Sequence, residues 1–128
     1  EASTLGPIVA ESAAKAGIKL SPDPLPEEGL FTRSDHYRFV QQGIPSVFLM
    51  NGFEGPGEKA FKDFLATHYH KPSDDLKLPI DWVAGAKFAE VNYHIIRGIA
   101  DATEQPRWYA GNLFGKEFAP TAPKAPRP

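Results

Sequence analysis

The chain has 128 residues, a net charge of −2 and no cysteine; 41% of its residues are hydrophobic and 23% are charged. This is enough material for one modest core, in a composition typical of globular proteins. Nucleic acids and anionic membranes select basic surfaces, so the slightly acidic balance argues against both as main partners. No apolar run approaches the roughly 20 residues of a membrane-spanning helix, and without cysteine there is no disulfide framework.

The two ends of the chain suggest a piece of a larger protein. The sequence begins at Glu1 and its only methionine is Met50, so we expect a processed product or a segment of a longer polypeptide. Prolines punctuate residues 119–128, which predicts an extended, mobile tail or a linker. The alternative interpretation of this tail is a proline-rich ligand for a partner.

The first half of the chain alternates helix and strand patterns. Apolar residues at intervals of three and four predict an amphipathic helix over residues 3–16, followed by a short strand at 18–20. A proline-paced loop covers residues 21–29. Ser34 stands at an N-cap position, so we expect a short helix over the next eight residues. The unbroken apolar run at 46–50 predicts a strand buried on both faces.

The second half is predicted to be mainly helical. A glycine-rich loop at residues 51–57 precedes a helix that begins near Ala60 and leads to His68. The longest element, over residues 80–103, carries separate apolar and polar stripes, which predicts an amphipathic helix packed on other elements. Residues 107–118 are rich in aromatic side chains and are expected to close the structure. Within them, Trp108 and Tyr109 are predicted core or contact residues, as is Trp82.

The alternation of helices and strands predicts an α/β fold with a parallel sheet. Only two strands are credible, however, and independent sheets usually have three or more. The sequence therefore favours a fragment of an α/β domain over a complete one.

The segment from Thr67 to Asp75 concentrates residues that suit a metal site. If it is extended, His68 and His70 point to the same side; if the backbone bends at the Pro-Ser-Asp-Asp run, each side chain has its own direction. Neutral imidazole binds zinc, and a ligating ring usually donates its second N–H to a carboxylate, which Asp74 or Asp75 could supply. The alternatives are a polar loop with a chance His-x-His and an Asp74 that only fixes the turn.

A second motif lies upstream of this segment. Arg33-Ser34-Asp35-His36 is followed by Phe39 and by Gly43-Ile44-Pro45, and Tyr69-His70 with Asp74 comes later. Together these motifs resemble the C-terminal part of zinc aminopeptidases with two co-catalytic metals, whose relatives include glutamate carboxypeptidases and glutaminyl cyclases. The resemblance covers about residues 3–118.

The resemblance implies both a fold and an activity. Residues 1–118 would be the C-terminal portion of a three-layer α/β/α sandwich with a mostly parallel sheet, and residues 119–128 a proline-rich tail. The complete protein would be a zinc-dependent aminopeptidase that removes N-terminal residues from peptides with metal-activated water. Family members suggest export to the periplasm or outside the cell. The implied partners are a peptide substrate, the N-terminal part of the same protein and a second copy in a homo-oligomer.

The resemblance also implies roles for individual residues. His70 matches the last zinc ligand, and Tyr69 matches a tyrosine that in some members stabilises the oxyanion. The matching residues that line the substrate side of the cleft are Arg33, Ser34 and Asp35. The other zinc ligands and the general base precede this region in the family, so we expect the fragment alone to be inactive. Asp74 would accept a hydrogen bond from the second N–H of the His70 ring and so orient this ligand.

Three alternatives remain open at this point. Glu27-Glu28-Gly29 resembles the family's base-and-ligand pair, but it stands in the wrong order along the chain. His36, His68 and His70 could form a single-zinc site, although nothing there supplies a base. The whole chain could also be a metal-free binding or dimerisation module of the same fold, or part of a single-zinc glutaminyl cyclase. His94, on the polar stripe of the long helix, is predicted to be an exposed helix position.

Overall fold

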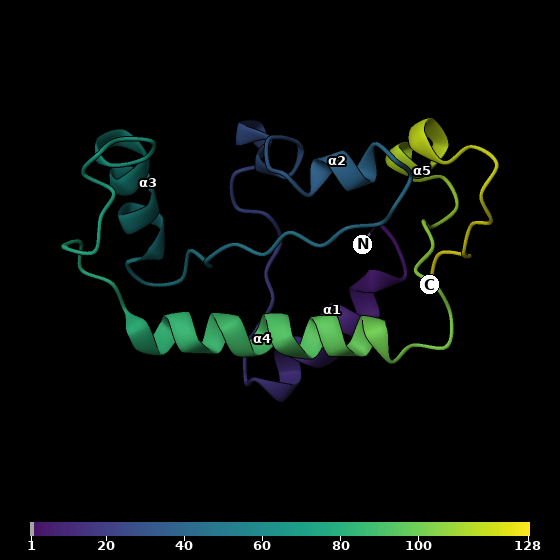
Figure 1. Cartoon of the computed structure of the whole chain (residues 1–128), viewed down its shortest axis with the longest axis horizontal. Helices are drawn as coiled ribbons and strands as arrows, with labels where there is room; N and C mark the ends of the chain where they lie inside the picture. The colour runs from purple at the N-terminus through teal and green to yellow at the C-terminus, as the bar shows by residue number, and fades with distance from the viewer. Residues whose placement is uncertain (1) are drawn as a thin grey trace.

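The protein is a set of helices joined by long extended segments (Figure 1), and a computed structural model describes residues 2–128. In chain order the helical elements are α1 (Leu5–Lys15), η1 (Pro26–Glu28), η2 (Leu30–Thr32), α2 (Tyr37–Val40), α3 (Gly57–Thr67), α4 (Trp82–Ala100) and α5 (Leu113–Phe118). Within the described residues, β pairing is limited to two isolated bridges, Ser3 with Trp108 and Tyr109 with Ala125. In Figure 1, α3 and α5 lie at opposite ends of the molecule, and α4 runs along one side.

The predicted α/β/α sandwich is therefore wrong for this structure. The segment 46–50, predicted as a strand buried on both faces, pairs with no other strand in residues 2–128, and none of its five residues is fully buried. The segment 18–20, predicted as a short strand, is also unpaired within the described residues. A parallel sheet needs neighbouring backbones within hydrogen-bonding distance, and an apolar pattern alone does not supply them. The apolar side chains of these segments are used differently, because Ile18, Val47 and Leu49 pack on the helical core.

One core lies between α1 and α4. Ala16 meets Val91 and Ile95 there, and all three are buried. Gly98 lets the two helices approach closely, because a Cβ at this position would lie 2.9 Å from Cγ2 of Ile8. At the start of α4, the Asp81 carboxylate accepts a hydrogen bond of 2.9 Å from the backbone N–H of Ala84, a standard N-cap. The predictions of these two helices, over residues 3–16 and 80–103, are confirmed.

A second core joins the end of the chain to α2. Its buried members are Val40, Trp108 and Ala119, and the partly buried Phe114 and Phe118 of α5 pack against it. The indole Nε1–H of Trp108 donates a hydrogen bond of 2.7 Å to the carbonyl of Gly43. The prediction that Trp108 is a core residue is confirmed, since its side chain is only 3% exposed.

The proline-rich end of the chain is held against this core. The Ala125 N–H donates to the Trp108 carbonyl at 2.9 Å, and the Ala110 N–H donates to the Ala125 carbonyl at 2.8 Å. Lys124 also donates to the carbonyl of Ala119. Ala125 is buried. This part of the tail is thus folded back along residues 108–110, whereas its composition favours a mobile segment.

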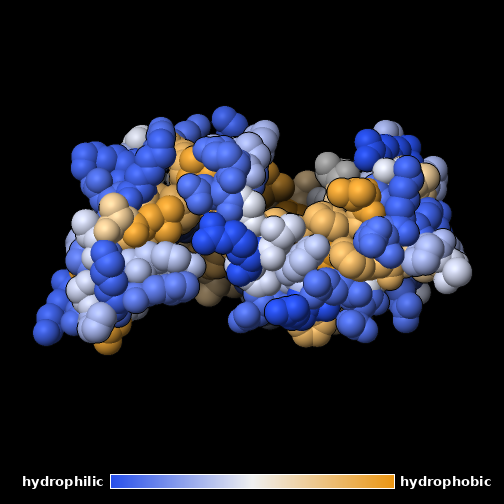
Figure 2. Space-filling view, turned by 90° about the horizontal axis from the view of Figure 1, so that it is seen from above, coloured by the Kyte–Doolittle hydropathy of each residue, from blue (hydrophilic) through white to orange (hydrophobic). Residues whose placement is uncertain are grey.

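Apolar side chains remain on the surface. Leu76, Trp82, Val83 and Ile96 are each more than half exposed on α4 or just before it. Trp82 is 67% exposed, so it is not a core residue of this chain, and of the two alternatives predicted for it only the contact residue remains. Seen from above, the molecule presents separate apolar areas towards its two ends (Figure 2). In the described part of the chain, no helix combines the length and the apolar character that spanning a bilayer requires.

Candidate functional site

The Tyr69-His70 motif sits on a tight turn at the end of α3. The N–H groups of His68 and Tyr69 both donate to the carbonyl of Phe64, at 2.9 and 3.0 Å, which ends the helix. His70 then takes a φ of 56°, the only left-handed backbone at a non-glycine position in residues 2–128. This conformation is unfavourable for most residues other than glycine, so the surrounding structure must maintain it. Residues with such backbone strain are often found at functional sites. Here the Lys71 N–H closes the turn on the His68 carbonyl at 2.9 Å.

The turn separates the two histidines and brings Tyr69 onto His70. The rings of Tyr69 and His70 are stacked, with their centroids 3.8 Å apart and their planes 23° apart. His68 points elsewhere, since its Nδ1 lies 3.0 Å from the hydroxyl of Ser73. Of the two geometries that the sequence leaves open, the bent one is therefore present. Tyr69 and His70 are both exposed, so the pair is presented to the surroundings.

The two aspartates behind the motif have different surroundings. The Asp75 carboxylate accepts a hydrogen bond of 2.8 Å from the backbone N–H of Lys77 and lies 3.7 Å from its Nζ. It therefore fixes its own turn. The Asp74 side chain is exposed, and it makes no hydrogen bond to another residue in the described part of the chain.

The Arg33-Ser34-Asp35-His36 motif forms the bend between η2 and α2. The Arg33 guanidinium donates to the carbonyl of Glu28 at 3.1 Å and lies 3.4 Å from its carboxylate. Ser34 is half-buried and Asp35 is exposed. This use of Glu28 supports the rejection of Glu27-Glu28 as a base-and-ligand pair. Sequence reasoning missed the contact because two short 3₁₀ turns, and no regular helix, bring residues five apart together.

His36 is held by aromatic rings. It is stacked on Phe48 with centroids 4.7 Å apart and planes 14° apart, and it meets Phe31 edge-on at 4.6 Å. Its Nε2 is buried and has no hydrogen-bond partner in residues 2–128. Burial lowers the pKa of the His36 imidazole below its ordinary value, and a backbone hydrogen bond at Phe31 and the charge of Asp35 oppose this only in part. His36 is thus placed to brace the bend, and its burial favours the neutral form of the ring.

The segments that carry the two motifs lie on the same side of α4, apart from each other, in Figure 1. No hydrogen bond or ion pair of the described residues joins His70 to Arg33 or Asp35. The two motifs are therefore separate from each other in this structure.

The described residues do not form a metal site by themselves. Nowhere in residues 2–128 do three or more His, Asp or Glu side chains gather so that they could hold a metal ion. His36, His68 and His70 have separate surroundings, which argues against the single-zinc alternative. The donor set available here amounts to one exposed imidazole, and a zinc site needs about three protein ligands.

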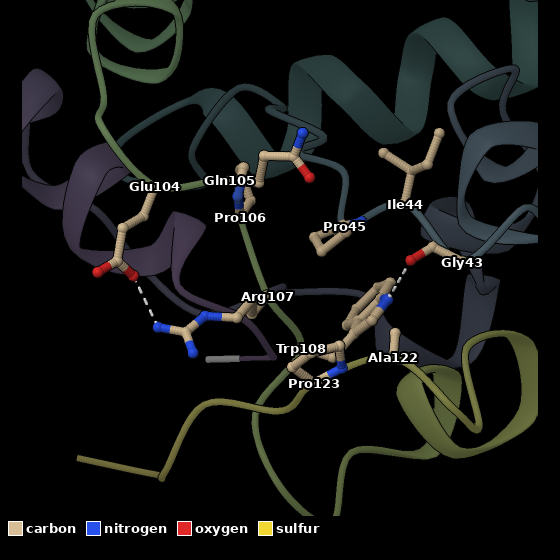
Figure 3. Close-up of a pocket in the computed structure, with 10 residues that line it drawn as sticks. All are labelled: Gly43, Ile44, Pro45, Glu104, Gln105, Pro106, Arg107, Trp108, Ala122 and Pro123. Atoms are coloured by element: carbon tan, nitrogen blue, oxygen red, sulfur yellow. Dashed lines mark hydrogen bonds and ion pairs between the residues drawn. The ribbon is translucent and has the colours of Figure 1, made fainter.

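A cavity lies where the turn after α2, which carries Gly43-Ile44-Pro45 of the upstream motif, meets the closing segment of the chain. It has a volume of 760 Å³ and is formed where residues 43–45, 104–108 and 122–123 meet (Figure 3). Arg107 and Glu104 form an ion pair of 2.7 Å at its edge, and the Trp108–Gly43 hydrogen bond lies beside it. None of the site residues expected from the sequence lines this cavity.

Comparison with known proteins assigns the chain to a family. Searches among curated proteins and among solved structures gave no match. A family model described as Peptidase family M28 matches residues 1–96, which include both motifs. This match covers three quarters of the chain and confirms the metallopeptidase resemblance that Arg33–His36 and Tyr69-His70 carry. The chain is therefore a member of peptidase family M28.

Proposed function

We propose that this chain contributes one zinc ligand, one oxyanion donor and part of the substrate wall to a zinc-dependent aminopeptidase. The family match supports peptidase activity. The observation that carries the finer proposal is the left-handed conformation of His70, which holds an exposed imidazole against an exposed phenol. A packing role would need neither the strained backbone nor the exposure.

In this proposal, His70 binds zinc together with ligands from polypeptide outside residues 1–128. Zinc in such enzymes activates water and polarises the substrate carbonyl. Because the described residues provide no cluster of three donors, the 128-residue chain alone is expected to hydrolyse no peptide. Asp74 is the carboxylate proposed to accept the second N–H of the His70 ring once the ligand is engaged.

The remaining residues act on the substrate. The phenolic O–H of Tyr69, held beside His70 by ring stacking, would donate a hydrogen bond to the oxyanion that forms at the scissile carbonyl. Arg33, Ser34 and Asp35 form the proposed substrate wall. The exposed Asp35 carboxylate has the charge that complements a free N-terminal ammonium, and the ion pair with Glu28 restrains Arg33.

The decisive experiment compares His70→Ala with His94→Ala in the complete enzyme. His94 lies on α4 near Glu90, far from the motif in sequence, and serves as the matched control. We expect His70→Ala to lose bound zinc and to lower the hydrolysis of an aminoacyl chromogenic substrate by more than about 100-fold, since even changes behind a ligand cost 10–100-fold. His94→Ala should retain both. Full zinc content and activity in His70→Ala would contradict the proposal.

A metal-free binding or dimerisation module is the second candidate, favoured by the lack of a three-donor cluster in residues 2–128. Equilibrium dialysis of the complete protein with zinc distinguishes the two, because the module would bind no stoichiometric metal. Assaying a peptide with N-terminal glutamine in parallel identifies a glutaminyl cyclase, which would release a cyclised product without cleaving a peptide bond.

A further inference from the structure

α5 contacts the segment that carries the Arg33–His36 motif. The ring of Phe114 lies 5.5 Å from that of Phe31 and 5.9 Å from that of Tyr37, measured between centroids. In the sequence, Phe31 lies two residues before the motif and Tyr37 directly follows it. α5 itself lies beyond residues 1–96, the part that the family model matches. An element outside the matched region thus packs against both ends of the proposed substrate wall.

The contact continues into the bend itself. Phe31 meets His36 edge-on, and His36 is stacked on Phe48, so four aromatic rings follow one another from α5 to the extended segment after α2. His36 Nε2 has no hydrogen-bond partner among the described residues. Ring packing therefore contributes to the orientation of His36 alongside the backbone hydrogen bond at Phe31, and loss of a neighbouring ring would change the surroundings of the imidazole.

α5 is firmly anchored, although six residues are too few for a stable isolated helix. The Asn112 side chain accepts a hydrogen bond of 3.1 Å from the Gly115 N–H. Gly115 packs directly on Trp108, since a Cβ added at Gly115 would lie 2.6 Å from the Trp108 Cβ. Trp108 in turn donates a hydrogen bond to the Gly43 carbonyl. The Phe118 ring of α5 also meets Tyr37 at 6.2 Å. The position of Phe114 is thus set by contacts that do not involve the motif.

We propose that Phe114 is a positioning residue, which presses Phe31 against His36 and thereby sets the placement of Arg33, Ser34 and Asp35. α5 then contributes to substrate binding without touching substrate. The catalytic consequence rests on the proposed function of the wall. The positioning itself is a property of the 128-residue chain and is tested there.

The test uses Phe114→Leu and Phe114→Ala, with Leu113→Ala as the control, because Leu113 neighbours Phe114 but is 72% exposed. Histidine ring signals of the 128-residue chain are followed by NMR during a pH titration, and the His36 signal is assigned with His36→Gln. We expect both Phe114 variants to move the His36 ring signals and to raise the pKa of His36 towards its ordinary value, because water reaches the ring. The other histidine signals and those of Leu113→Ala should stay as in the parent.

A second readout uses the complete enzyme. Phe114→Leu should raise KM several-fold with a smaller change in kcat, as expected when a binding wall is displaced. Unchanged His36 signals in a folded Phe114→Leu protein would overturn the positioning role. If Phe114→Ala fails to fold, the leucine variant still decides. A complete enzyme with no peptidase activity would refute the proposed function, whereas the NMR result would stand independently.

Discussion

Trp108 and Gly43 are joined by a hydrogen bond of 2.7 Å between residues 65 positions apart in the chain. Through this bond the closing segment is fixed to the turn that follows α2. Gly43 has a φ of 82°, and a Cβ there would lie 2.8 Å from the carbonyl oxygen of Phe118. The backbone of the turn and the closing segment are therefore fitted to each other closely enough that only glycine is accommodated.

Replacing Trp108 with Phe should lower the free energy of unfolding by about 1–3 kcal/mol, since the Gly43 carbonyl loses its partner. Urea denaturation of the 128-residue chain measures the change. Trp82→Phe is the control, because Trp82 is 67% exposed, and it should change stability by less than about 0.5 kcal/mol. Equal effects of the two substitutions would show that the Trp108 bond contributes nothing.

The two glycines of α4 should respond in opposite directions to alanine. An added Cβ at Gly85 meets nothing within 4 Å, so Gly85→Ala should stabilise the chain by up to about 1 kcal/mol through helix propensity. At Gly98 the same atom would lie 2.9 Å from Ile8 Cγ2, and the resulting overpacking of α1 on α4 costs about 1–3 kcal/mol. Thermal unfolding followed by circular dichroism checks both. A gain at Gly98 equal to that at Gly85 would refute the close approach of the helices.

His36 should make the chain less stable in mild acid. Burial lowers its pKa in the folded state, so the unfolded state binds more protons between that lowered value and the ordinary value near 6.5. The contribution of neutral His36 is complete above about pH 6.5 and is lost as the pH falls through this window. Urea midpoints at pH 7.5, 6.5 and 5.5 measure the slope. His36→Phe, which keeps a ring between Phe31 and Phe48, should flatten it, and an unchanged slope would assign it to other groups.

Tyr69→Phe should lower kcat of the complete enzyme by about 10²–10³-fold while zinc content stays the same, because only the oxyanion donor is removed. Steady-state kinetics with an aminoacyl chromogenic substrate, together with metal analysis, test this. Tyr93→Phe is the matched control, because Tyr93 is also exposed and its hydroxyl accepts a hydrogen bond from Arg97 on α4. Wild-type kcat in Tyr69→Phe would exclude the phenol from catalysis.

The helices are the part of the fold that the sequence predicts well. The expected helix over 3–16 corresponds to α1, and the one over 80–103 corresponds to α4. Both have long apolar stripes, a signal that repeats over several turns and does not depend on other segments. The short helix expected after Ser34 is reduced to Tyr37–Val40, because four residues give too little periodicity to locate its ends.

The predicted parallel sheet, in contrast, is wrong, because the described residues contain only two isolated β-bridges. The apolar run at residues 46–50 predicts a strand, but the hydrogen bonds of a strand depend on a partner that its own sequence does not specify. The proline-rich tail is a similar case. Its composition favours mobility, whereas the backbone hydrogen bonds of Ala125 with residues 108 and 110 hold this part of the tail in place.

For the candidate site, sequence patterns suggest residues, but they do not predict the geometry of those residues. Tyr69-His70 stands out as a motif, yet the sequence does not predict the left-handed φ of His70, because most histidines, although they adopt this conformation more often than most residue types, do not have it. The ion pair of Arg33 with Glu28 also goes undetected, because it depends on the intervening 3₁₀ turns. Motif spacing reports chemistry, while orientation depends on turns and tertiary packing.

The pairing of residues 108–110 couples two remote parts of the chain. The Tyr109 N–H donates to the Ala2 carbonyl at 3.0 Å, and the Ala110 N–H donates to the Ala125 carbonyl at 2.8 Å. Residues near both ends of the described polypeptide therefore depend on the same short segment. A substitution that displaces the backbone of residues 108–110 would release both of them together.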